Sequence, residues 1–427
     1  MTGTSTAAST KPPAARWMKI LGSSVLDQAL LSAANFAVGL ILIRYAEDSQ
    51  YGYYVLLFNT VMLLTMLQNS FIGTPLVITL PKLAPPEKRQ WLGSLHKDQS
   101  RVLGACAIVL LTGVSVLWAF GIVGNSGIVL MLAAIAAIVT SLYREFFRNT
   151  LLIFQRPQFV LLADILYALG LVAGCLVAVQ FPIAATIAIL ATALCALAGG
   201  RILSYWMRDL TDANATPGRL LAIAPIGLWA ACGSGVYWLL NQGYSFVTAF
   251  TLDIAAVGAL AAARLLMMPV NLVCTGVQKQ VTPAASHWLH DHGAASALRK
   301  LGGVALVMGT AVLFYSVLTW LARDWIFTDL LRKDHPERDV LLILWAAIFL
   351  VKALRDPPML ILVLKQQFRI LTFSSLACAL LALLLCFILT GIMGPTGALW
   401  GMLAGETLSL VAVLFFSWHA SRQKGES

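Results

Sequence analysis

The sequence predicts an all-α integral membrane protein with about twelve transmembrane helices, arranged as two six-helix lobes around a central cavity. Three observations support this prediction. The 427 residues are 59% hydrophobic and only 11% charged, with a mean hydropathy of +0.83, a balance that soluble domains rarely have. Apolar stretches of about 20 residues, the length that spans a hydrocarbon core, recur along the chain. The two halves of the chain also resemble one another in sequence.

The apolar stretches predict where the membrane spans begin and end. Each is long enough to cross the bilayer as a helix, and polar connections separate them. The predicted spans are 20–43, 55–80, 102–123, 127–143, 159–179, 183–203, 220–250, 255–281, 301–321, 340–362, 370–392 and 399–416.

Lysine and arginine predict the orientation. With both termini in the cytoplasm, most of the 29 basic residues lie on cytoplasmic segments, as the positive-inside rule requires. The outer loop 323–339 carries four basic residues, but five acidic residues accompany them. The net charge of +10 thus reflects topology and attraction to anionic lipid, and it indicates no nucleic-acid partner. We expect a disordered cytoplasmic tail at 1–16, an N-lobe at 17–203, a cytoplasmic linker at 204–219, a C-lobe at 220–417 and a cytoplasmic tail at 418–427.

The internal repeat defines how the lobes are related. A shift of 206 residues places Tyr51-Gly52 on Val257-Gly258 and Glu47 on Asp253, and it aligns the second span with the eighth. Six spans in each half give both halves the same orientation, so the pseudo-two-fold axis runs along the membrane normal.

Polar residues concentrate in spans 1, 2, 7 and 8, which are equivalent pairs under the repeat. Such faces line a central cavity; the alternative is that they join helices through interhelical hydrogen bonds of about 1 kcal/mol each. From these faces, the residues expected to contact substrate or line the cavity are Asp27, Gln28, Asn35, Asn69, Asn241, Arg264, Asn271 and Gln278. Trp229, Tyr237, Trp238 and Tyr244 are candidate surfaces for sugars.

Arg264 is the most informative of these residues, because it interrupts an otherwise charge-free span. A charge at this depth is costly and usually functional. It has two possible partners: an anionic substrate, or Asp27 across the lobes as an ion pair that opens and closes during alternating access.

Other charged residues carry less weight. Asp164 and Glu406 lie in spans with G-x-x-x-G pairs, Gly170 with Gly174 and Gly401 with Gly405, which predict close helix packing. Lys352, Arg355 and Asp356 precede Pro357-Pro358, where we expect the tenth helix to kink or break. Arg144, Glu145 and Arg148 occupy a similar place in the first half. These groups are interpreted as anchors at the cytoplasmic membrane surface, with contact to lipid or substrate phosphates as the alternative.

Several other functions find no support in the sequence. The histidines at 287, 290 and 292 have no cysteine or consistent carboxylate partner, so a turn is favoured over a metal site. The seven cysteines fall inside predicted spans without C-x-x-C spacing. We find no phosphate-binding glycine-rich loop and expect no cofactor.

Several segments resemble the polysaccharide transporter family, the Wzx-like O-antigen and exopolysaccharide flippases. They are RYAEDSQYGYY at 44–54, REFFR at 144–148 with QRP at 155–157, and VGALAAARLL at 257–266 before QVTP at 280–283. The resemblance implies membership of the multidrug/oligosaccharidyl-lipid/polysaccharide (MOP) superfamily. It also implies that Arg264 is a cationic cavity residue. Some members have several deep arginines, whereas this sequence indicates one.

The function that the resemblance implies is translocation of an undecaprenyl-diphosphate-linked oligosaccharide across the bacterial inner membrane. We expect a transporter and not an enzyme, driven by an H+ or Na+ gradient and working beside a polysaccharide polymerase or export machinery. A multidrug and toxin extrusion (MATE) carrier is the main alternative. An integral-membrane polymerase is a weaker one, because the outer loop 323–339 is small for a catalytic domain.

Overall fold

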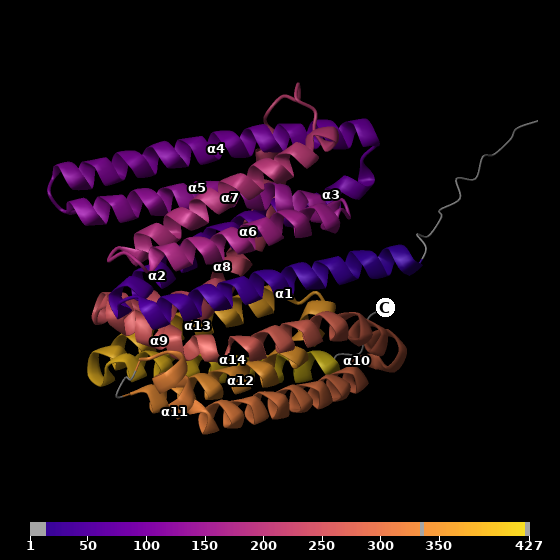
Figure 1. The fold of residues 1–427 in the computed structure, drawn as a ribbon. Coiled ribbons are helices and arrows are strands. Elements are labelled where there is room, and N and C mark those ends of the chain that lie inside the picture. Colours follow the sequence, from indigo (N-terminus) through magenta and orange to yellow (C-terminus); the bar gives the residue numbers. More distant parts are fainter. Residues whose placement is uncertain (1–13, 334–336, 423–427) are drawn as a thin grey trace, which may run out of the picture.

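The computed structural model describes residues 14–333 and 337–422, which are almost entirely helical (Figure 1). The first half contains α1 (Ala14–Tyr45), α2 (Asp48–Gln68), the π-helical turn η1 (Asn69–Gly73), α3 (Thr74–Thr79), η2 (Leu80–Lys82), α4 (Pro85–Ala119), α5 (Asn125–Ile153), α6 (Pro157–Ala178) and α7 (Ala184–Trp206). After η3 (Arg208–Leu210), the second half contains α8 (Arg219–Thr251), α9 (Ile254–Leu266), α10 (Met268–Leu321), α11 (Arg323–Trp325), η4 (Ile326–Leu330), α12 (Arg338–Leu364), α13 (Phe368–Met393) and α14 (Pro395–Arg422).

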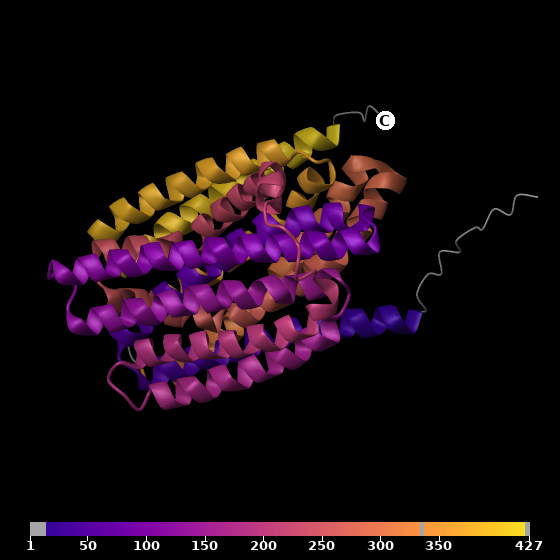
Figure 2. The same ribbon diagram turned by 90° about the horizontal axis from the view of Figure 1, so that it is seen from above.

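The helices form two lobes, here called the N-lobe (α1–α7) and the C-lobe (α8–α14). In Figure 1 the indigo and magenta helices of the first half lie above the orange and yellow helices of the second. Figure 2 shows that the long helices run roughly along one common direction. The lobes meet mainly where α2 packs against α8 and α9 and where η1 packs against α8.

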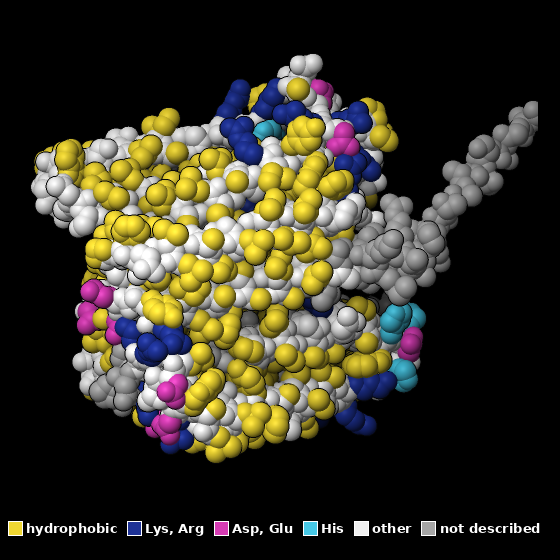
Figure 3. Space-filling model, in the orientation of Figure 1, with side chains coloured by type: hydrophobic (Ala, Val, Ile, Leu, Met, Phe, Trp, Pro, Cys, Tyr) yellow, Lys and Arg dark blue, Asp and Glu magenta, His cyan; other side chains and the backbone are white. Residues whose placement is uncertain are grey.

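The surface has the pattern of a membrane protein. Charged side chains gather toward the ends of the helices, and the face between them is largely hydrophobic (Figure 3). Large apolar side chains exposed on the surface include Leu169, Leu306 and Phe314. In the described part of the chain, ten helices are long and apolar enough to cross a membrane. The protein is therefore a multi-pass membrane protein.

These ten helices are compatible with twelve crossings. The helix α10 reverses at Gly293, whose φ of 76° is favourable only for glycine, so its two arms form separate spans. The long helix α12 is not among the ten, and Lys352, Arg355 and Asp356 interrupt its apolar sequence.

Close contacts between the lobes follow the sequence repeat. A methyl group on Gly52 would overlap the carbonyl oxygen of Ile254, and one on Gly258 would lie 2.6 Å from the carbonyl oxygen of Asp48. The two contacts are equivalent under the repeat, because Gly52 and Gly258 are 206 positions apart and so are Asp48 and Ile254. Only glycine allows backbones to approach this closely, so the repeat that the sequence predicts is also the register of the interface.

A second pair of equivalent positions lies after α5 and α12. Gln155 and Gln366 both have left-handed backbones, with φ of 57° and 56°, as is typical just beyond a helix C-terminus. They are 211 residues apart, so the register of the repeat shifts by five residues between the second span and the fourth. This register pairs Arg144 with Arg355 and Glu145 with Asp356.

The predicted G-x-x-x-G contacts are confirmed. Gly170 and Gly174 lie against Cys195 and Ala191 of α7. Gly401 and Gly405 lie against Cys386 and Ala382 of α13 in the same way.

Three expectations about helix boundaries are wrong. The eighth span is not one helix, because α9 ends at Leu266 and α10 begins at Met268; Pro269 lacks the N–H that would continue the hydrogen-bond ladder. The histidine segment expected to be a turn is helical and belongs to α10. Of the two alternatives for the tenth helix, the break is wrong, because the helix continues through Pro357 and Pro358 to Leu364, and Ser417 Oγ of α14 donates to the Pro358 carbonyl at 3.0 Å.

The ends of the chain also differ from expectation. Helix α1 already begins at Ala14, inside the expected tail, and α14 continues to Arg422. The remainder of both expected tails, 1–13 and 423–427, lies outside the described residues.

Candidate functional site

A cavity of about 230 Å³ lies between the lobes. Residues of α1 and α2 form its N-lobe wall, and residues of α8, α9, α10 and α12 form its C-lobe wall. The cavity therefore lies between spans 1, 2, 7 and 8, as the polar faces predict, with the tenth span as an additional wall. Ligand pockets usually enclose about 300–1,000 Å³, so this cavity admits a head group and not a large ligand.

Arg264 borders the cavity from α9, and residues of the C-lobe hold it in place. Its guanidinium donates hydrogen bonds to Gln242 Oε1 and, at 3.5 Å, to the Tyr244 hydroxyl. The rings of Tyr244 and Trp345 lie 5.8 and 5.3 Å from its central carbon, within cation–π range. Trp345 is itself fixed, because its indole nitrogen donates to the Leu260 carbonyl at 3.0 Å. Arg264 thus has a preformed position without a carboxylate partner among the described residues.

Lys352 brings a second positive charge to the cavity. It lies near the middle of α12, is 8% exposed, and donates from Nζ to Asn241 Oδ1. Its interpretation as an anchor at the membrane surface is wrong. The prolines that follow Lys352 suggest a helix end, whereas α12 continues past them to Leu364. Lys352 therefore lies deep between the lobes.

The cavity wall combines these two cations with aromatic and amide side chains. Tyr51, Tyr54, Phe58 and Phe349 contribute rings, and Asn35, Asn59, Asn241, Gln242 and Asn271 contribute amides. No aspartate or glutamate is among the described residues that line it. The cavity is therefore cationic.

The structure brings together some of the predicted site residues and separates others. Asn35, Asn241, Arg264 and Asn271 border the cavity, as do the predicted sugar surfaces Tyr237, Trp238 and Tyr244. Gln28 is exposed on α1, Asn69 hydrogen-bonds within the N-lobe, and Trp229 is 63% exposed. Neither Gln278 nor Trp229 is among the cavity-lining residues.

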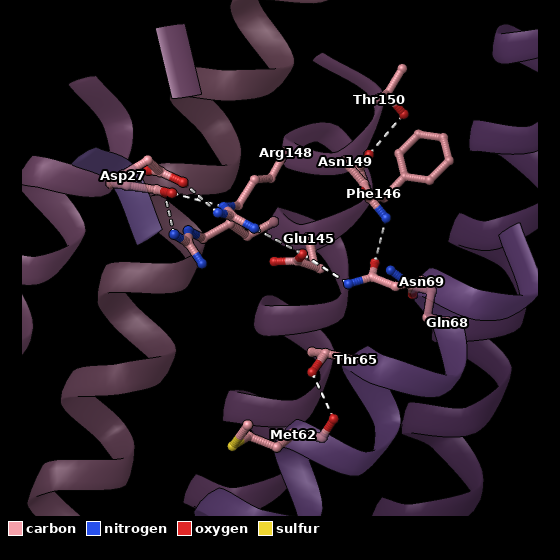
Figure 4. Close-up of polar contacts among 12 residues, drawn as sticks. Asp27, Met62, Thr65, Gln68, Asn69, Glu145, Phe146, Arg148, Asn149 and Thr150 are labelled. Atoms are coloured by element: carbon pink, nitrogen blue, oxygen red, sulfur yellow. Dashed lines mark hydrogen bonds and ion pairs between the residues drawn. The ribbon is translucent and has the colours of Figure 1, made fainter. Parts of the chain in front are cut away.

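Asp27 does not pair with Arg264, which corrects the expected gate between the lobes. Its Oδ2 accepts from Arg148 Nη2 at 2.5 Å inside the N-lobe (Figure 4). Asp27 shares Arg148 of α5 with Asp164 of α6, and it precedes the cavity-lining residues of α1, Asn35 and Gly39, by eight and twelve residues. Arg144 and Arg148 both bind Asp164, and Arg355 binds Glu406. Asp164 and Glu406, for which the sequence predicts only close helix packing, are thus central members of buried ion pairs.

The site residues predicted from the sequence do not include Gln242, Trp345 or Lys352, which the structure places at the cavity or around Arg264. Asn241 and Gln242 lie one helical turn beyond Tyr237 and Trp238, so helical periodicity could have identified Gln242. The contacts of Trp345 and Lys352 depend on how α12 packs against α8 and α9, which the sequence does not specify.

The fold and the cavity define a multi-pass membrane protein whose two helical lobes enclose a central cavity. No family model matches the chain, and no curated protein matches its sequence. Among solved structures, the chain is similar to the lipid II flippase MurJ in an inward closed conformation, with a TM-score of 0.74 and 11% identity over 93% of this chain and 87% of MurJ.

Two other MOP superfamily transporters share the fold. An inward-facing multidrug resistance MATE transporter gives a TM-score of 0.69 and 12% identity, covering 91% of this chain and 94% of its own. A transporter from Pyrococcus furiosus, described by the reverse polarity of its binding pocket, gives 0.65 and 13%, covering 96% of each chain. At these identities the similarity shows a MOP-type fold, whose neighbours here are transporters and flippases.

Proposed function

We propose that this protein is a flippase that moves an undecaprenyl-diphosphate-linked oligosaccharide across the bacterial inner membrane for surface polysaccharide biosynthesis. Alternating access between the two lobes carries the head group, and an ion gradient drives the cycle. A polysaccharide polymerase or export machinery then uses the product. The observation that carries this proposal is the pair of cations, Arg264 and Lys352, in a cavity whose described wall contains no carboxylate.

The charge of the cavity favours an anionic head group. A diphosphate that leaves water for a low-dielectric interior needs compensating positive charge and hydrogen-bond donors. Arg264 supplies a guanidinium held by Gln242 and Tyr244, and Lys352 supplies an ammonium held by Asn241. Tyrosine and tryptophan rings beside them are suitable surfaces for sugars.

The size of the cavity supports transport by lobe separation. A volume of about 230 Å³ admits a diphosphate and little more, so a lipid-linked oligosaccharide enters only when the lobes move apart. The similarity to an inward closed flippase structure is consistent with a closed stage of such a cycle. We place both termini in the cytoplasm on the strength of the positive-inside rule.

A MATE-type drug carrier of the same fold is the second candidate, because MATE transporters are among the structural neighbours. A cationic drug would need acidic groups in the cavity, whereas two basic groups are present there. A negatively charged or neutral drug would be compatible with the cavity.

The test is a reconstituted flipping assay. Proteoliposomes containing the protein and a fluorescent undecaprenyl-diphosphate oligosaccharide are treated with a membrane-impermeant quencher, and the fraction that changes leaflet is measured over time. We expect flipping that Arg264→Ala abolishes. Arg101→Ala is the matched control, because Arg101 is exposed on α4 and outside the cavity.

The assay also separates the alternatives. Flipping by Arg264→Ala at the wild-type rate would contradict the role of the cationic cavity. Absence of lipid flipping, together with efflux of a drug from the same vesicles, would favour the MATE-type carrier.

A further inference from the structure

The connection between α10 and α12 is long, and part of it reaches the other lobe. Sixteen residues separate the end of α10 at Leu321 from the start of α12 at Arg338, whereas five separate α4 from α5 at the equivalent place in the N-lobe. Residues 322–333 of this connection, which include α11 and η4, are here called the strap. The N-lobe connection, 120–124, is too short to form such an element, so the strap is a feature of the C-lobe alone.

A lysine at the end of the strap binds the N-lobe. Lys333 donates from Nζ to Asp48 Oδ1 at 2.7 Å and to the Ala46 carbonyl at 3.1 Å. Both acceptors lie where α1 ends and α2 begins, in the segment 44–48, here called the corner. One ammonium group thus makes two hydrogen bonds from the C-lobe to the corner of the N-lobe.

An arginine of the corner makes the reverse contact. Arg44 donates from Nη1 to the Leu330 carbonyl of the strap at 3.0 Å. The strap is also packed against its surroundings, because Phe327 and Leu331 are buried and belong to the same apolar core cluster as Leu42 of α1. The contact between strap and corner therefore has two polar tethers, one from each lobe, beside an apolar base.

The corner leads directly into the cavity wall. Asp48 is the first residue of α2, and Tyr51, about one turn later, lines the cavity. The close contact of Gly52 with the Ile254 carbonyl lies in the same turn. In Figure 1 the end of the molecule that carries α11 is opposite to the C-terminus, and it is the outer end in the proposed orientation. The strap thus joins the two lobes on the outer side of the cavity.

The tethers can be released. The side chains of Lys333 and Asp48 are 22% and 36% exposed, so water and ions reach this ion pair. An ion pair at this exposure is weak and is screened by salt. When the contact opens, water replaces the acceptors of both cations, so neither is left buried without a partner.

We propose that the strap is a reversible lock between the lobes. Lys333 and Arg44 hold strap and corner together while the cavity is closed to the outside, and both contacts break when the lobes separate there to release the cargo. Lys333 then moves with the C-lobe, and Arg44 and Asp48 move with the N-lobe. The proposal rests on the lobe separation that the proposed function requires, but not on the identity of the cargo.

The experiment measures the separation of the lobes at the outer end. Spin labels are attached to Phe181→Cys, between α6 and α7, and to Ile392→Cys, near the end of α13; both positions are exposed. The exposed Cys106 and Cys232 are replaced by alanine. Pulsed electron paramagnetic resonance gives the distribution of distances between the labels in the full-length protein, in lipid nanodiscs at fixed pH and without cargo.

We expect Lys333→Met to increase the fraction of molecules with the longer distance severalfold, because it removes both hydrogen bonds to the corner. Lys333→Arg retains the charge and the donors and should keep the original distribution. Arg332→Met is the matched control. It removes one positive charge from the neighbouring residue of the strap, whose side chain is exposed, and it should leave the distribution unchanged.

Salt provides a second measurement on the same proteins. Raising the KCl concentration should increase the longer-distance fraction when Lys333 is present, because salt screens a partly exposed ion pair. The increase should be much smaller in Lys333→Met, which has no such pair to screen.

Three results would overturn the proposal. They are an unchanged distribution in Lys333→Met, an equal increase in Arg332→Met, and the same response to KCl with and without Lys333. A lower melting temperature of Lys333→Met with unchanged distances would show a static brace instead of a lock. Because no cargo is present, these outcomes are independent of the flipping assay.

Discussion

Replacing Lys352 with methionine separates what this residue does for folding from what it does for binding. Methionine keeps a long unbranched chain and removes the charge. Lys352 is 8% exposed, donates to one protein acceptor, Asn241, and shares the cavity with Arg264. In a stabilising ion pair, removal of one partner costs about 3–5 kcal/mol because the other charge remains buried. Lys352 has no such partner among the described residues that line the cavity.

The expected effect on stability is therefore small. Loss of the Asn241 hydrogen bond costs about 1 kcal/mol. This cost is offset because the neutral side chain is not repelled by Arg264 and avoids the free-energy penalty of burying an ammonium group. We expect the free energy of unfolding to change by less than about 1 kcal/mol. Binding of an anionic head group should be affected far more. A charge-assisted hydrogen bond contributes about 1.5–3 kcal/mol, so affinity should fall about 10- to 150-fold.

The assay combines thermal unfolding in detergent with titration of a prenyl diphosphate by intrinsic tryptophan fluorescence. Lys279→Met is the matched control, because Lys279 is exposed on α10 and outside the cavity wall; it should change neither quantity. A Lys352→Met protein that binds as tightly as the wild type, or that loses several kcal/mol of stability, would refute the reasoning.

Three further predictions follow from individual contacts. Gly52→Ala should shift the lobes apart and lower stability by about 1–3 kcal/mol, because its methyl group overlaps the Ile254 carbonyl; Gly104→Ala, which meets nothing within 4 Å, serves as the comparison in thermal unfolding. Asp164→Asn should cost about 3–5 kcal/mol, since it leaves two buried arginines with less compensation, and an unchanged melting temperature would contradict this. Arg156 donates two hydrogen bonds that lower the pKa of Asp209 in the connection after α7. The ion pair stabilises the folded state above the ordinary carboxyl pKa, and this stabilisation is lost as the pH falls through the lowered pKa of Asp209. Because both side chains are partly exposed, the stabilisation amounts to less than about 1 kcal/mol. The difference in stability between the wild type and Asp209→Asn should therefore shrink at acidic pH.

Much of the fold is readable from the sequence because hydrophobic length and glycine spacing act locally. The repeat that aligns Gly52 with Gly258 reappears as reciprocal contacts, and the G-x-x-x-G pairs reappear at helix crossings. The errors arise where local signals compete. Pro357-Pro358 indicates a break, but the surrounding helices of the C-lobe stabilise a continuous α12. Pro269 gives a weaker signal, but the helix does break beside it.

For the candidate site, too, the sequence predicts some features and not others. An arginine in an apolar span needs a polar environment wherever the span packs, so the position of Arg264 beside a cavity follows from its sequence neighbours. Its partners do not. Asp27 and Arg264 are both isolated charges in the sequence, and pairing them is chemically reasonable, but the packing of α1 within the N-lobe places Asp27 beside Arg148 instead.

The sequence by itself therefore determined a two-lobed membrane protein, the spans that enclose its cavity and the position of Arg264 beside that cavity, because burial energy and helical periodicity are properties of short segments. Only the tertiary structure decided that Lys352 joins Arg264 in the cavity and that Asp27 belongs to a separate buried cluster in the N-lobe. Those assignments depend on the rotation and depth of each helix relative to its neighbours, which packing between distant segments fixes.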